Sequence, residues 1–133
     1  MRVTTTALFV TKSLDMDFQA IPIIRIFDEI KAKEFYLEFL GMTLDWEHRF
    51  ETGYPMYMQV SKGSLVFHLS EHSGDGSPGT KIFVNTVGLD TLAEEVTAAE
   101  YKYCKPVIEI APWGSRVFEV IDPFSNRIVF NEK

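Results

Sequence analysis

Cysteine, positive charge and long apolar runs are all scarce in this sequence. Cys104 is the only cysteine among 133 residues, which excludes an intramolecular disulfide and any metal or iron-sulfur site built from several cysteines. Thirteen Lys and Arg against nineteen Asp and Glu give a net charge of −6, so the basic surface of nucleic-acid-binding proteins is missing. No run of about 18 apolar residues and no secretory leader is found, which predicts a cytoplasmic protein without a membrane partner.

Motifs for common catalytic chemistry are also missing. The sequence has no glycine-rich phosphate loop, and no serine or cysteine lies in a nucleophile motif. Large apolar side chains, in contrast, are plentiful, since the chain has eleven Phe, five Tyr and two Trp residues. They suffice for the core of one compact domain.

Hydrophobic periodicity divides the chain into two similar halves. In the first, an alternating stretch at 21–26 predicts a strand, Asp28 is a candidate N-cap, and an apolar stripe predicts a helix that ends at Gly41. Three further strands are predicted before residue 71. This half has the order β-α-β-β-β.

The same order returns after a segment rich in Gly, Ser and Asp at 71–80, which we interpret as a linker. A strand begins at Lys81, Asp90 or Thr91 caps a helix, and three strands follow. Val60 and Val120 occupy matching places in the two halves, which indicates an internal repeat. We therefore expect an N-terminal extension at 1–19 and one domain at 20–133, made of halves 20–72 and 80–133.

The predicted fold is α+β, with two tandem βαβββ units forming a curved mixed sheet. Alternate strand residues point to opposite faces, so one parity predicts the core and the other a concave cleft. The cleft face mixes apolar with a few polar groups, as ligand sites do. Its candidate ligand-binding residues are Tyr57, Gln59, His68, Phe83, Asn85 and Glu119, with Trp113 at the rim.

Three stretches resemble the glyoxalase, bleomycin-resistance and dioxygenase superfamily, also called vicinal oxygen chelate proteins, and most of all its bleomycin-resistance family. They are residues 20–41, residues 88–92, and Pro-Trp-Gly at 112–114 followed by Phe118, Asp122-Pro123 and Asn126. Ser125 departs from the pattern, which usually has glycine there.

The resemblance also implies where a metal would be bound in the enzymes of this superfamily. Those four ligand positions fall here on Ile21, His68, Lys81 and Val129, of which only His68 is suited to ligate a metal at neutral pH. We therefore expect no metal, no other cofactor and no catalytic residue.

The resemblance implies a homodimer that sequesters a bleomycin-type glycopeptide, or another bulky aromatic or cationic compound, in clefts at its two-fold interface. Trp113, Tyr57 and Phe83 would stack on the ligand, Glu119 would match its charge, and polar groups such as Gln59 would supply hydrogen bonds. Two alternatives remain open: a metal-dependent lyase, isomerase or dioxygenase of the same superfamily, and a small interaction domain with a vestigial cleft.

Overall fold

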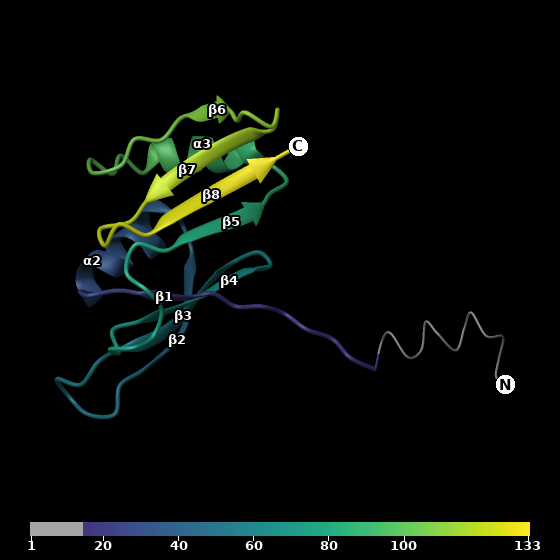
Figure 1. Cartoon of the computed structure of the whole chain (residues 1–133). Helices are drawn as coiled ribbons and strands as arrows, with labels where there is room; N and C mark the ends of the chain where they lie inside the picture. Colours follow the sequence, from purple (N-terminus) through teal and green to yellow (C-terminus); the bar gives the residue numbers. More distant parts are fainter. Residues whose placement is uncertain (1–14) are drawn as a thin grey trace, which may run out of the picture.

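The computed structural model describes residues 15–133 and consists of two four-stranded mixed sheets (Figure 1). Strand order is β1-β4-β3-β2 in the first sheet and β5-β8-β7-β6 in the second. β1 pairs in parallel with β4, and β5 pairs in parallel with β8. The other strand pairs are antiparallel. This arrangement confirms the predicted α+β fold of two tandem βαβββ units. The predicted extension at 1–19 lies mostly outside the described residues.

The first sheet contains β1 (Ile23–Arg25), β2 (Thr43–His48), β3 (Tyr57–Lys62) and β4 (Leu65–Ser70). The second contains β5 (Lys81–Asn85), β6 (Ile108–Ile110), β7 (Arg116–Ile121) and β8 (Arg127–Glu132). β1 and β6 are shorter than their sequence patterns predict, because Pro22 and Pro106, which have no backbone N–H, lie just before them.

The helical segment of the first half is divided in two. Asp28 caps α2 (Glu29–Lys33) as predicted, because its carboxylate accepts a hydrogen bond from the Lys31 N–H. The chain then widens into a π-helix, η1 (Glu34–Phe39), in which Leu40 N donates to Phe35 O at 2.9 Å. Periodicity predicted one continuous α-helix here, since a π-turn does not disturb the apolar stripe enough to be seen.

The predicted cap of the second helix was wrong. α3 (Leu89–Ala98) begins after Gly88, so Asp90 and Thr91 lie inside the helix. Its free N–H groups are capped instead from β8, where the Glu132 carboxylate accepts from Gly88 N at 3.0 Å and Leu89 N at 3.2 Å. A cap supplied from 43 residues away has no local sequence signal.

One continuous core lies between the helices and the two sheets. It is formed by the strand residues of the predicted core parity, among them Ile24, Phe67, Phe118 and Ile128, and by Phe35 and other apolar residues of the helices. Val129 has the opposite parity and was predicted to face the cleft, but only 4% of it is exposed.

A buried polar cluster joins the two halves. The Tyr36 hydroxyl donates to Asp122 Oδ2 at 2.7 Å, and Asp122 also accepts from the Asn126 backbone and side chain. The Asn126 amide donates to the carbonyl of Arg25 at 2.9 Å and accepts from the backbone of Gly79 and Thr80. Asp122 and Asn126 thus tie the second half to the helix and first strand of the first half.

The linker is fixed against the edge of β1. Gly76 has a φ of +67°, and a Cβ atom placed on it would lie 2.6 Å from the carbonyl oxygen of Ile23. Only glycine permits both this backbone conformation and this close approach. The linker therefore covers a strand edge that would otherwise be open.

Candidate functional site

The seven candidate ligand-binding residues lie in two separate groups, one on each sheet. Tyr57, Gln59 and His68 lie on β3 and β4 and contact one another. The other four, Phe83, Asn85, Trp113 and Glu119, belong to the second half. Within residues 15–133, no hydrogen bond, ion pair or ring contact joins the two groups. We call them the N-terminal face and the C-terminal face.

A directed chain of hydrogen bonds crosses the N-terminal face. Gln59 donates through Nε2 to Asp45 Oδ2 at 3.0 Å, which leaves its Oε1 to accept from His68 Nε2 at 2.9 Å. His68 Nδ1 is then free to accept from the Tyr57 hydroxyl at 2.7 Å. In the neutral imidazole both ring nitrogens are occupied, and the chain ends on a carboxylate.

Burial raises the pKa of Tyr57 above its ordinary value of 10.0, and the charge of Asp75 adds to the shift. Tyr57 therefore keeps its proton at neutral pH and remains the donor to His68. The hydrogen-bond chain holds both rings in place.

Sequence reasoning missed two residues of this face, Asp45 and Trp46. A β-bulge separates the pairs Leu44–Val60 and Trp46–Gln59, so Asp45 has no partner of its own. The Asp45 carboxylate bonds Gln59 and Ser61, and the indole of Trp46 stacks near-parallel to Tyr57 with ring centroids 6.0 Å apart. The bulge breaks the alternation that parity analysis depends on, so both side chains lie on one face.

The C-terminal face is organised around Trp113, which is 61% exposed. Its indole N–H donates to Asn131 Oδ1 at 3.2 Å, and the Asn131 amide donates to Asn85 Oδ1 at 3.4 Å. The ring of Phe83 lies 6.3 Å from that of Trp113. Buried Asn131, which was not among the predicted site residues, therefore orients Trp113.

Glu119 is not a free carboxylate, because Arg127 forms an ion pair with it at 3.1 Å. Glu119 and the Phe83–Trp113 pair line one shallow cavity of about 330 Å³, together with Lys81 and Val129. All residues that line this cavity come from the second half of the chain.

The positions that hold a metal in enzymes of this fold do not fit one here. The side chains of Ile21 and Val129 have no donor atom, Lys81 is not one of the usual metal-ligating residue types, and both nitrogens of His68 are engaged. Among residues 15–133, no group of three or more His, Cys, Asp or Glu side chains has a geometry suited to a metal ion.

Known structures with this architecture include both binding proteins and an enzyme. A bleomycin-binding protein in complex with bleomycin is 17% identical, with a TM-score of 0.68, and the match covers 88% of this chain and 99% of that one. The bleomycin-binding protein of bleomycin-producing Streptomyces verticillus, with copper(II)-bleomycin, is 23% identical, with a TM-score of 0.65 and coverage of 89% and 98%. A glyoxalase-related enzyme from Clostridium phytofermentans is 20% identical, with a TM-score of 0.68 and coverage of 89% and 96%.

At these identities the structural likeness establishes the fold. No curated protein matches the sequence. No helix of the described residues is long and apolar enough to cross a membrane.

Residues 8–133 match the family described as glyoxalase superfamily protein, which covers both βαβββ units. The chain therefore belongs to the glyoxalase superfamily.

Proposed function

We propose that the protein is a cytoplasmic homodimer that binds and sequesters a bulky compound with planar aromatic and cationic groups, such as a bleomycin-type glycopeptide. The observation that carries this proposal is a pair of exposed aromatic platforms, one on each face. Trp46 stacks on Tyr57, and Trp113 lies beside Phe83, all on strands or turns fixed by the sheets. Aromatic contacts of this kind contribute roughly 0.5–1.5 kcal/mol each beyond the apolar area they bury.

Charge on the N-terminal face favours a cationic ligand. The Asp45 carboxylate accepts from Gln59 and Ser61, and two donors leave lone pairs available on a carboxylate that accepts up to about four hydrogen bonds. Glu119 is already neutralised by Arg127, so its contribution is smaller than the sequence alone suggested. We therefore assign charge recognition chiefly to Asp45.

Dimerisation would complete the site. In a two-fold dimer, any contact from one chain to its partner is repeated in the opposite direction. The N-terminal face of each chain can therefore oppose the C-terminal face of the other, which gives two equivalent clefts. Each cleft would then have two aromatic platforms with the ligand between them. The bleomycin-binding proteins of the same fold are complexed with bleomycin or its copper(II) form, which supports this ligand class.

The test is calorimetric titration of the purified protein with metal-free and copper(II)-loaded bleomycin, with its molar mass in solution measured in parallel. We expect a dimer that binds one ligand per cleft. Trp46→Ala should weaken binding by about 1–3 kcal/mol, as loss of a central aromatic contact does. Phe27→Ala removes an exposed ring that contacts Phe124 and Arg25, outside both faces, and is the matched control. Equal losses in the two variants would contradict the proposal.

The same samples distinguish a metal-dependent enzyme of this superfamily. Elemental analysis of ligand-free protein should find no stoichiometric metal if the chain is a binding protein. A bound divalent ion at one per chain would contradict sequestration and favour a lyase, isomerase or dioxygenase. The engaged nitrogens of His68 are the structural reason to expect the first result.

A further inference from the structure

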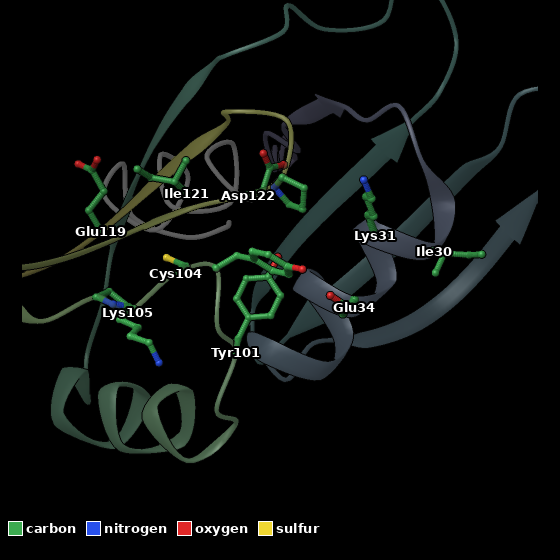
Figure 2. A pocket seen from close by; sticks show the side chains of 12 residues that line it. Ile30, Lys31, Glu34, Tyr101, Cys104, Lys105, Glu119, Ile121 and Asp122 are labelled. Carbon is green, nitrogen blue, oxygen red and sulfur yellow. The ribbon is translucent and has the colours of Figure 1, made fainter.

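A large cavity lies beside the helices and shares only Glu119 with the C-terminal face. It encloses about 840 Å³ and is lined by residues from three segments, 30–34, 101–106 and 119–123 (Figure 2). Its volume is within the range of about 300–1,000 Å³ that small-molecule sites occupy. We call it the helix-side pocket.

The pocket has a rigid aromatic wall. Tyr101 packs on Phe39 with ring centroids 4.6 Å apart and meets Phe35 edge-on at 5.8 Å. Tyr103 meets Tyr101 edge-on at 5.5 Å. Ile30 is 77% exposed, so this wall continues into an apolar rim that has no covering in residues 15–133. Preformed apolar walls of this kind bind aromatic or branched groups with little loss of side-chain entropy.

The π-helix η1 contributes its first residue to the pocket. Glu34, its first residue, lines the cavity, whereas the hydroxyl of Tyr36 bonds Asp122 in the buried cluster. Short π-helical stretches are rare and frequently occur at functional sites. The pocket therefore borders the start of such a stretch.

Uncompensated charges of both signs surround the apolar wall. Figure 2 shows Lys31 and Glu34 on one side of the pocket and Lys105 on the opposite side. Within residues 15–133, none of these three side chains forms an ion pair or a side-chain hydrogen bond. The other acidic groups of the lining are engaged, since Glu119 pairs with Arg127 and Asp122 bonds Tyr36 and Asn126.

We propose that the helix-side pocket is a second small-molecule site, and that it takes an aromatic zwitterion of the α-amino-acid type. The apolar group would pack against Tyr101, the ammonium would pair with Glu34, and the carboxylate would pair with Lys31, which lies on the same side of the pocket. A simple anion would leave the Glu34 carboxylate without a partner in the occupied pocket. A simple amine would leave the Lys31 ammonium without one. This site does not depend on the function proposed for the two faces.

The test compares three probes of similar size by calorimetry and by amide chemical shifts: L-phenylalanine, 3-phenylpropanoate and phenethylamine. We expect L-phenylalanine to bind at one per chain, at least fivefold tighter than the other two, and to perturb residues 101–106. Glu34→Gln and Lys31→Met should each weaken it at least threefold, whereas Lys105→Met, on the opposite side of the pocket, should weaken it less. Glu94→Gln, an exposed substitution on α3, is the control and should have no effect.

The proposal is overturned if all three probes bind equally, if none binds at millimolar concentration, or if Glu94→Gln weakens binding as much as Glu34→Gln. Bleomycin titrations of Glu34→Gln should be unchanged, which separates this site from the faces.

Discussion

Ser125 has a left-handed backbone, with a φ of 69°, in the turn that follows Asp122. This conformation costs a residue with a Cβ atom about 1–2 kcal/mol, and glycine adopts it freely. Ser125→Gly should therefore stabilise the protein, although the gain is reduced by the greater freedom of glycine in the unfolded chain. We expect a net increase of about 0.5–1 kcal/mol.

The increase should appear in urea as a higher midpoint with an unchanged slope. Ser64→Gly, at a turn position without positive φ, is the control and should give no increase. An unchanged midpoint in Ser125→Gly would mean that the turn imposes no strain.

Tyr36 should make stability fall at high pH. Burial raises its pKa well above the ordinary value of 10.0, and the nearby charge and hydrogen bond of Asp122 add to the shift. Above about pH 10 the unfolded chain loses this proton and the folded chain keeps it, so stability decreases as pH rises. Tyr36→Phe should show a smaller decrease between about pH 9 and 11 in urea unfolding. Parallel curves for the two proteins would exclude Tyr36 as the source.

At the scale of single elements, α3 depends on a cap from another strand. Glu132→Ala removes the acceptor of Gly88 N and Leu89 N, and should lower the free energy of unfolding by about 1–2 kcal/mol. Glu132→Gln keeps an acceptor oxygen without the charge and should lose less. Urea unfolding monitored by circular dichroism measures both. Glu94→Ala, within the same helix, should change stability by less than about 0.5 kcal/mol.

Asn126 joins elements from both halves. Asn126→Ala should reduce stability by about 2–4 kcal/mol, because it removes one of the donors to Asp122 and the side-chain hydrogen bonds to the Arg25 carbonyl and two linker N–H groups. The control, Asn85→Ala, removes an exposed amide of β5. Similar midpoints for the two variants in urea would show that the buried cluster does not hold the halves together.

Element boundaries also show what the sequence can predict. Strand parity identified Tyr57, Gln59 and His68 as one face, because β3 and β4 pair without interruption. It failed for Asp45 and Trp46, because a bulge in a partner strand depends on pairing and not on composition. The cap by Glu132 and the role of Asn131 were missed for a related reason, since both are contacts between residues distant in sequence.

For the whole molecule, the proposed clefts between chains give a distinctive result in mixed dimers. If each cleft combines the N-terminal face of one chain with the C-terminal face of the other, a dimer of Trp46→Ala and Trp113→Ala has one intact cleft. Mixing the two variants under exchange conditions should then restore tight bleomycin binding in about half of the dimers, at one ligand each. Clefts within single chains would restore none, and calorimetric stoichiometry separates the two cases.

The bulge at Asp45 also affects how this family of folds can change its ligands. Since β2 is an edge strand, an inserted or deleted residue there alters its outward side chains and leaves the pairing of β3 with β4 in place. Deletion of Asp45 would restore strict alternation and change which β2 side chains lie on the N-terminal face. A one-residue change in the length of β2 would thus alter the proposed binding face without any substitution in the core.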